Sequence, residues 1–84
     1  MAEVVVYASQ FCPYCRWARA LLDGKGVDYT LIDVDRNPGE RRTMEQRSGR
    51  HTVPQIFVGE THVGGFDDLS ALDRAGGLDP LLAG

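Results

Sequence analysis

The feature that most constrains the fold is a short β-branched segment followed by a helical segment and then by a second strand-like segment. Residues 4–8 (VVVYA) predict a buried strand, and residues 28–34 (DYTLIDV) predict the second one. The segment between them ends at Gly24 and Gly26. Its apolar residues recur at three- and four-residue spacing and are Trp17, Ala18, Leu21 and Leu22. Two strands joined by a helix form a right-handed parallel crossover, so this part of the chain predicts a β-α-β unit.

The remaining segments predict a second helix, a hairpin and a third helix. Residues 37–39 (NPG) predict the turn into the second helix. Residues 53–58 and 61–64 predict two strands joined by a tight turn, and the third helix is expected to begin around residue 67. Residues 78–82 (LDPLL) predict an apolar flap over the core. The order β-α-β-α-β-β-α predicts an α/β protein with a mixed four-stranded sheet flanked by three helices, which cover both faces.

Length, charge and the N-terminal sequence limit the class of protein. A chain of 84 residues predicts one small domain, residues 1–84, with a thin core. The net charge of −3 gives nucleic acid no overall electrostatic attraction. No apolar run approaches the roughly 20 residues of a membrane span, and residues 1–7 enter the first strand without a basic and apolar leader. We therefore expect a cytoplasmic protein that binds neither nucleic acid nor membranes.

Both cysteines lie in one short stretch, Phe11–Arg16 (FCPYCR), where two residues separate Cys12 from Cys15. A structural disulfide there would close a very short loop and so would remove little entropy from the unfolded chain. A structural zinc site wants four ligands, and the two remaining candidates, His51 and His62, do not have the spacing of a finger or ribbon. We expect each histidine to be an ordinary surface or half-buried residue, and we expect no metal site.

A redox centre fits the local physics of this stretch better. Cys12 lies at the start of the predicted helix, and Pro13 takes the first helical position, where a missing N–H loses no partner. Cys12 is then exposed beside free backbone N–H groups, whereas Cys15 points toward the body of the protein. The field of the helix end contributes only about 0.3–1 kcal/mol to a thiolate. Hydrogen bonds to sulfur and a nearby cation must supply the remainder, and Arg16 is the closest cation in sequence. The stretch predicts that Cys12 is a nucleophile.

Three separate segments resemble one known family. They are Cys12–Cys15 (CPYC), Thr52–Pro54 (TVP) and Gly64–Asp68 (GGFDD), in this order and within the predicted pattern of elements. Together they resemble a glutaredoxin of the small bacterial dithiol kind, nearly from end to end. The resemblance implies a thioredoxin-like fold and a glutathione-dependent thiol–disulfide oxidoreductase. It also implies no bound cofactor, with glutathione as the reducing co-substrate.

The resemblance implies that glutathione binds beside the cysteines. Val53 precedes a proline, Pro54, that is cis in the family, and it would offer its N–H and C=O to the cysteinyl backbone of glutathione. Thr52 belongs to the same segment. Tyr14 would be a solvent-facing wall near the two thiols. Arg47 is the candidate for binding the glycyl carboxylate.

The start of the third helix is the second part of the implied site. Gly65 permits close approach of the backbone, and Phe66 belongs to the same segment. The free N–H groups of the helix start suit the γ-glutamyl carboxylate. The Asp67 side chain suits the neighbouring ammonium, with Asp68 also near. Capping of the helix is the other role open to these two acids, and the two roles are compatible.

One position departs from the family pattern. Glutaredoxins commonly place a lysine three residues before the first cysteine, and Ser9 holds that position here. The lysine would stabilise the thiolate and would bind the glycyl end of glutathione. Our hypothesis is that Arg16 or Arg47 partly replaces it. Trp17 and Phe57 are assigned to packing.

The implied mechanism is thiol–disulfide exchange, with Cys12 as the attacking thiolate and Cys15 as the resolving thiol. The expected partners are glutathione and glutathionylated or disulfide-containing proteins, with ribonucleotide reductase among the candidates, and the expected state is a monomer. Two alternatives stay open: a glutaredoxin-like redoxin reduced by thioredoxin reductase, and a non-enzymatic iron–sulfur carrier that shares one cluster between two Cys12 thiolates and two glutathiones. A generic zinc-binding module is a third.

Overall fold

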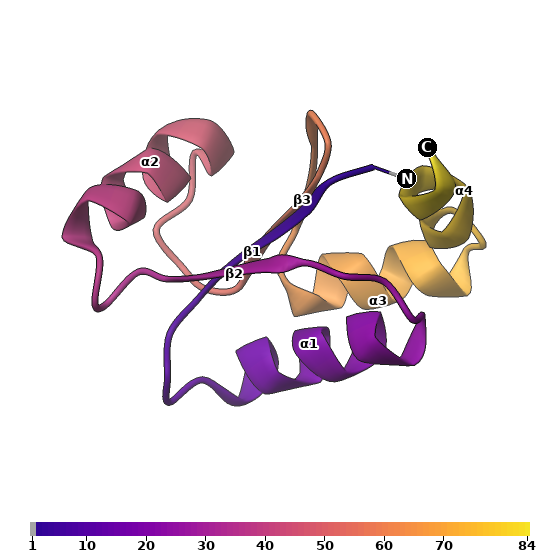
Figure 1. Ribbon diagram of the computed structural model, residues 1–84, viewed down its shortest axis with the longest axis horizontal. Helices are drawn as coiled ribbons and strands as arrows, with labels where there is room; N and C mark the ends of the chain where they lie inside the picture. Colours follow the sequence, from indigo (N-terminus) through magenta and orange to yellow (C-terminus); the bar gives the residue numbers. More distant parts are fainter. Residues whose placement is uncertain (1) are drawn as a thin grey trace.

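The computed structural model describes residues 2–84, which form four strands and four helices (Figure 1). The elements are β1 (Val4–Ala8), α1 (Pro13–Gly24), β2 (Thr30–Asp33), α2 (Pro38–Ser48), β3 (Gln55–Val58), β4 (Thr61–Gly64), α3 (Phe66–Arg74) and α4 (Leu78–Ala83). The predicted order is confirmed as far as α3, and a fourth helix follows it. None of the helices found in residues 2–84 is long and apolar enough to span a membrane.

The four strands form one mixed sheet in the order β2-β1-β3-β4. β1 pairs with β2 in parallel, which confirms the predicted crossover through α1. β3 pairs antiparallel with both β1 and β4, and β3 and β4 form the predicted hairpin. In the β1–β3 pair, Tyr7 lies opposite Gln55. This register places the loop that follows β1 beside the segment that precedes β3, and Cys12 lies at the end of that loop.

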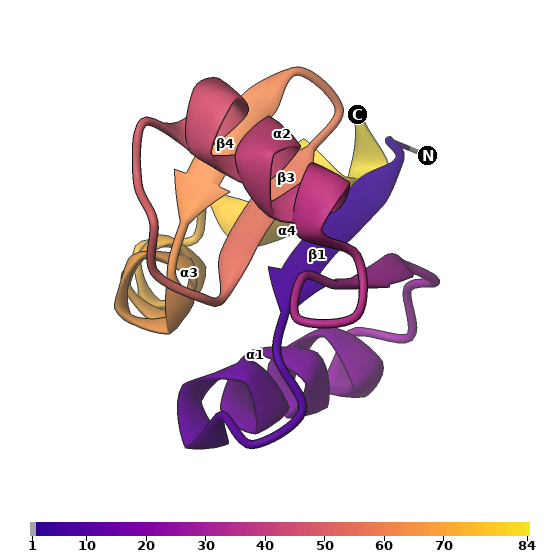
Figure 2. The same cartoon turned by 90° about the vertical axis from the view of Figure 1, so that its left-hand side faces the viewer.

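Helices cover both faces of the sheet. α1 and α3 lie side by side against one face (Figure 1), and α2 lies against the other (Figure 2). The larger core lies under α1 and α3, and its buried members include Val6, Leu22, Ile56 and Leu69. The smaller core lies under α2 and consists of Tyr7, Val34, Met44 and Phe57. Because successive residues of a strand point to opposite faces, β1 supplies a side chain to each core in turn.

The C-terminal segment corrects the prediction of three helices. Residues 78–82, expected as an apolar flap, belong to α4, in which Leu78 and Leu82 are both buried. Their spacing of four residues places them on one helical face. Pro80 lies in the first turn, where a missing N–H costs no intrahelical hydrogen bond. The Ala2 N–H donates to the Leu82 carbonyl at 3.3 Å, so both ends of the described chain lie together (Figure 1).

The apolar face of α1 is narrower than the sequence predicts. Ala18 and Leu22 are fully buried, and Leu21 packs at the edge of the core, as expected. Trp17 is instead 52% exposed. It lies on the flank of the buried stripe that Cys15, Ala18 and Leu22 form at three- and four-residue spacing. The indole ring is therefore part of the surface next to the cysteines.

Candidate active site

Cys12 caps the N-terminus of α1, directly after the loop that leaves β1. Its backbone is extended (φ −128°, ψ 105°), and Pro13 is the first helical residue, as predicted. The Cys15 N–H donates to the Cys12 sulfur at 3.2 Å. The Cys12 thiol donates to the Val53 carbonyl oxygen at a distance of 3.8 Å. The sulfur is half-buried and lies between an otherwise unpaired N–H of the helix start and the segment before β3.

Cys15 has the opposite environment, one turn further along α1. Only 2% of its surface is exposed, and it packs with Ala18 and Leu22 in the larger core. Burial raises the pKa of the Cys15 thiol to about 12, and its hydrogen bond with Cys12 acts in the same direction. The prediction that Cys15 points toward the body of the protein is confirmed. Cys15 is thus a protected, protonated thiol at neutral pH.

The segment before β3 brings a peptide edge to the Cys12 sulfur. The Val53–Pro54 peptide bond is cis, as the family resemblance implies. Pro54 is buried, whereas Val53 is partly exposed and Thr52 is exposed. The segment therefore presents Val53 at the surface with its carbonyl group next to the half-buried thiol.

The start of α3 forms the opposite wall of the site. Gly64 has a φ of 118°, which L side chains rarely adopt, and a Cβ at this position would collide with the Asp68 carboxylate. A Cβ on Gly65 would lie 3.5 Å from the Pro54 carbonyl oxygen, so the two walls approach closely there. The Asp68 carboxylate accepts the Gly65 N–H at 3.0 Å and so caps the helix. Asp67 is exposed at the same helix end.

An ion pair joins the two walls, and sequence reasoning missed its cation. Arg50 donates to the Asp68 carboxylate at 3.0 Å, and about half of each side chain is exposed. The Arg50 guanidinium, with help from the Gly65 N–H, lowers the pKa of Asp68. Arg50 is one of several arginines between residues 36 and 50. Its place three residues before Val53 is the only sequence signal that separates it from the others.

A groove of about 220 Å³ lies between the two walls. Its lining residues are Tyr14, Arg50, Thr52, Val53, Pro54, Gln55, Gly65, Phe66, Asp67 and Asp68. The structure thus brings together every residue predicted to contact glutathione except Arg47, and it adds Arg50 and Gln55. The sequence signal for Gln55 is a polar residue inside an otherwise apolar predicted strand. We call this hollow the groove.

Aromatic side chains form one rim of the groove. Tyr14 is 52% exposed, in agreement with a solvent-facing wall. Its ring meets the Trp17 ring edge to face with centroids 5.1 Å apart, and Trp17 meets Phe66 at 5.8 Å. Edge-to-face contacts of this kind hold aromatic rings in a defined arrangement. Trp17 therefore packs within this rim and not in the core under α1.

Arg47 lies on α2, outside the lining of the groove. Its guanidinium donates to the Tyr7 hydroxyl at 3.0 Å and lies 4.0 Å from the centroid of the Phe57 ring. Phe57 is buried, which confirms its assignment to packing. The assignment of Arg47 to the glycyl carboxylate stays a prediction.

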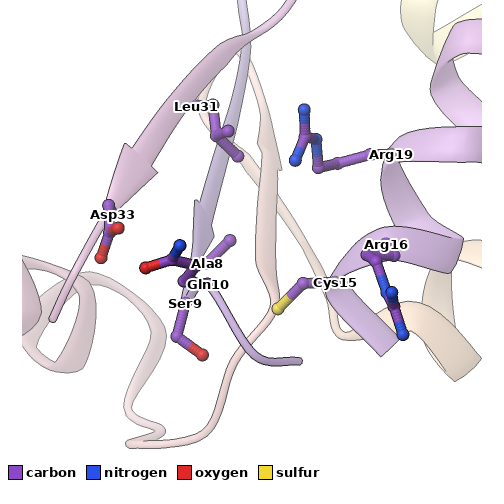
Figure 3. A pocket seen from close by; sticks show the side chains of 8 residues that line it. All are labelled: Ala8, Ser9, Gln10, Cys15, Arg16, Arg19, Leu31 and Asp33. Atoms are coloured by element: carbon purple, nitrogen blue, oxygen red, sulfur yellow. The ribbon is translucent and has the colours of Figure 1, made fainter. Parts of the chain in front are cut away.

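Arg16 and Ser9 line a second hollow, which shares no lining residue with the groove (Figure 3). Its lining consists of Ala8, Ser9, Gln10, Cys15, Arg16, Arg19, Leu31 and Asp33. Figure 3 shows the Cys15 sulfur at its wall, with Arg16 and Arg19 on the same helix. We call it the back hollow. That Arg16 partly replaces the family's lysine stays a prediction.

Both histidines lie where the sequence predicts. His51 is exposed, and His62 is half-buried with its ring stacked on Phe57 at 4.8 Å. His62 Nε2 lies 2.7 Å from Gln55 Oε1. Burial, and then the positive charge of Arg50, lower the pKa of His62. Across residues 2–84, no three His, Cys, Asp or Glu side chains gather in a metal-binding arrangement.

Comparisons with known proteins agree with one another. The family model Glutaredoxin matches residues 4–63. Glutaredoxin 3 of Escherichia coli is 55% identical over 82 residues, which span 98% of this chain and 99% of that protein. The solution structure of glutaredoxin from Brucella melitensis is 51% identical, with a TM-score of 0.86 over 98% of this chain and 89% of that one. The crystal structure of a buckwheat glutaredoxin–glutathione complex has a TM-score of 0.89 at 33% identity, over 98% and 77% of the two chains. These likenesses confirm the predicted thioredoxin-like fold.

Proposed function

Because this chain belongs to the glutaredoxin family and is a glutathione-dependent thiol–disulfide oxidoreductase, we propose that Cys12 is its nucleophile and Cys15 its resolving thiol. One contrast carries this assignment of roles. Cys12 is half-buried beside the groove and its sulfur accepts a helix N–H at 3.2 Å, whereas Cys15 is 2% exposed. A sulfur anion is favoured at a helix start with an N–H donor and is disfavoured in an apolar core.

The first reaction is the reduction of a glutathione mixed disulfide. The Cys12 thiolate attacks the glutathione sulfur, a Cys12–glutathione disulfide forms, and the substrate leaves as a thiolate that takes up a proton. A second glutathione thiolate then attacks the glutathione sulfur on Cys12. This step releases oxidised glutathione and returns the Cys12 thiolate. Only one protein thiol is needed for this cycle.

The second reaction is the reduction of a protein disulfide, and it needs both cysteines. Cys12 attacks one sulfur of the target, and Cys15 then attacks the Cys12 sulfur, which releases the reduced target and leaves a Cys12–Cys15 disulfide. Two glutathiones reduce that disulfide. Cys15 must lose its proton to attack. Burial is the main cause of its raised pKa, and two contributions from Cys12, a hydrogen bond and its charge, raise it further. Both of these contributions end when Cys12 enters a mixed disulfide, so the resolving thiol becomes easier to ionise at the step that uses it.

The chemistry of the groove supports glutathione as its occupant, as the glutathione complex of the buckwheat relative does. The backbone of Val53 is placed to pair with the cysteinyl residue, next to the Cys12 sulfur. The free N–H groups at the start of α3 suit the γ-glutamyl carboxylate. Asp68 is engaged with Gly65 and Arg50, so the exposed Asp67 carboxylate is the better partner for the ammonium. Helix capping and ligand binding are thereby divided between the two acids.

We infer a single domain, residues 1–84, that works as a monomer in the cytoplasm and binds neither nucleic acid nor membranes. Its protein substrates are glutathionylated or disulfide-containing proteins, and ribonucleotide reductase is one candidate. Glutathione is the reducing co-substrate, and no bound cofactor takes part. The family matches do not favour an iron–sulfur carrier or a redoxin reduced by thioredoxin reductase.

Turnover of a small glutathione mixed disulfide tests the function directly. The reaction is coupled to glutathione and glutathione reductase and is compared with thioredoxin reductase as the electron source. We expect steady turnover with glutathione and only background with thioredoxin reductase. Equal or faster turnover with thioredoxin reductase would contradict the proposal and would favour the redoxin alternative.

A further inference from the structure

Gln55 is the only buried amide among the described residues, 2–84, and none of their charged side chains is buried. Gln55 is 1% exposed, and it begins β3, directly after Pro54. A buried amide is costly unless its donors and acceptor find partners. Gln55 has such partners, and they lead in two directions: one to the wall of the groove and the other to the neighbouring strand β4.

The Gln55 side chain binds back to the preceding Thr52–Pro54 segment through its amide nitrogen. Gln55 Nε2 donates to the Thr52 carbonyl at 3.0 Å and lies 3.3 Å from the Thr52 hydroxyl. A carbonyl oxygen only accepts, so the atom of Gln55 that faces it must be the nitrogen. Gln55 Oε1 therefore faces the other way, toward His62.

The orientation of Gln55 fixes the protonation of the His62 ring. His62 Nε2 lies 2.7 Å from Gln55 Oε1, which is an acceptor, so Nε2 must carry a hydrogen. The ring is itself held by Phe57, on which it stacks and which is its partner in the β3–β4 pair. A chain of contacts thus runs from β4 through Gln55 to Thr52.

Thr52 is the neighbour of Val53, whose carbonyl oxygen accepts the Cys12 thiol. We propose that Gln55 and His62 are positioning residues for the glutathione reaction, because their hydrogen bonds hold the Thr52–Pro54 segment at the groove in the geometry that receives the substrate. The proposal rests on the proposed groove and extends it to two residues that touch neither reacting sulfur.

A pair of substitutions at His62 tests the proposal by steady-state kinetics with a small glutathione mixed disulfide. His62→Leu keeps bulk and removes the donor to Gln55, whereas His62→Gln offers an amide N–H in its place. We expect His62→Leu to raise KM about three- to tenfold, the range for one lost hydrogen bond, with kcat within about twofold. His62→Gln is expected to restore most of the affinity. Thr61→Ala, an exposed position on the same strand, is the matched control and is expected to leave both constants unchanged.

The outcomes separate this proposal from the proposed function. An inactive wild-type protein would overturn both. An active wild-type protein whose KM does not change in His62→Leu would overturn only the positioning role, as would a His62→Gln variant no better than His62→Leu. If His62→Leu fails to fold, nitrogen NMR of the wild-type imidazole decides: a neutral ring protonated at Nε2 supports the proposal, and one protonated at Nδ1 refutes it.

Discussion

Two hollows flank the turn of α1 that carries the cysteines, and they differ in what they offer to a substrate. The groove is lined by backbone edges at Val53 and at the start of α3, and its cation, Arg50, is already paired with Asp68. The back hollow, of about 160 Å³, has two arginines on its rim and the buried Cys15 at its wall. The half-buried Cys12 thiol lies beside the groove, at the Val53 carbonyl. Recognition is therefore expected from peptide edges and a helix start, and not from the side that carries Arg16 and Arg19.

The largest difference between the groove and the back hollow is expected in the activities that depend on their two thiols, Cys12 and Cys15. Cys12→Ser is expected to lower both mixed-disulfide and protein-disulfide reduction by at least about three orders of magnitude, because the nucleophile is lost. Cys15→Ser is expected to keep mixed-disulfide turnover and to lose most protein-disulfide reduction. The two assays on both variants measure this. Equal loss of both activities in Cys15→Ser would show that the two sides are not separated as proposed.

The burial of Cys15 predicts a loss of stability in alkali. The folded protein holds the Cys15 proton more tightly than the unfolded chain does, because the pKa is raised from 9.0 to about 12. This contribution to stability is complete below pH 9 and falls as the pH rises toward about 12, by at most about 1.4 kcal/mol per pH unit.

Urea unfolding of the reduced protein between pH 9 and about pH 12 measures how steeply the free energy of unfolding falls with pH. We expect Cys15→Ser to remove part of this slope and Cys12→Ser to keep most of it, since burial is the main cause of the raised pKa. Identical slopes in the wild type and in Cys15→Ser would mean that the back hollow admits water to this sulfur.

Substitutions at two acids of the groove are expected to affect different properties: Asp68→Ala the stability of the fold, and Asp67→Ala the binding of the substrate. Asp68→Ala removes a helix cap and an ion pair, and it is expected to lower the free energy of unfolding by about 0.5–2 kcal/mol. Asp67→Ala is expected to change that free energy by less than about 0.5 kcal/mol and to raise KM for the mixed disulfide about two- to fivefold. Denaturation and kinetics on both variants give the comparison. An unchanged KM in Asp67→Ala would remove this acid from the site.

The smallest effects are expected at the arginines outside the groove. Arg16 lines the back hollow and Arg47 binds Tyr7, so either charge would act on glutathione through solvent and would be partly screened. We expect Arg16→Ala and Arg47→Ala each to raise KM by no more than about twofold at physiological salt. If neither variant changes KM at low salt, neither Arg16 nor Arg47 replaces the family's lysine at the position of Ser9. That outcome would leave recognition entirely to the groove.

Much of the fold could be predicted because each element carries its own local signal. The β-branched run at Val4–Ala8, the helical spacing after Pro13 and the turn residues before α2 are all readable one segment at a time. The sequence does not predict the C-terminal helix because α4 is less than two turns long and contains a proline. Trp17 was assigned to packing because spacing alone does not show where a buried stripe ends.

The site residues also fall into those with a local sequence signal and those without one. The cysteine pair, the Thr52–Pro54 segment and the start of α3 are each a short continuous stretch of sequence. The structure brings the last two together at the groove and places Cys12 beside them. The contacts that sequence reasoning missed join residues of different elements: Arg50 to Asp68, and Gln55 to His62. Such pairs depend on the register of β3 with its neighbours and on the approach of two loops. Nothing in the local pattern of either partner indicates the other.

Residue-resolved alkylation is the most direct test of the central claim, that Cys12 is the reactive thiol and faces the groove while Cys15 is protected. The reduced, folded protein is treated with iodoacetamide at neutral pH, and each cysteine is followed by mass spectrometry, with and without prior formation of the glutathione mixed disulfide. We predict that only Cys12 is modified in the folded state, that glutathione blocks it, and that Cys15 reacts only after unfolding. Modification of Cys15 at a comparable rate, or a glutathione adduct on Cys15, would contradict the account.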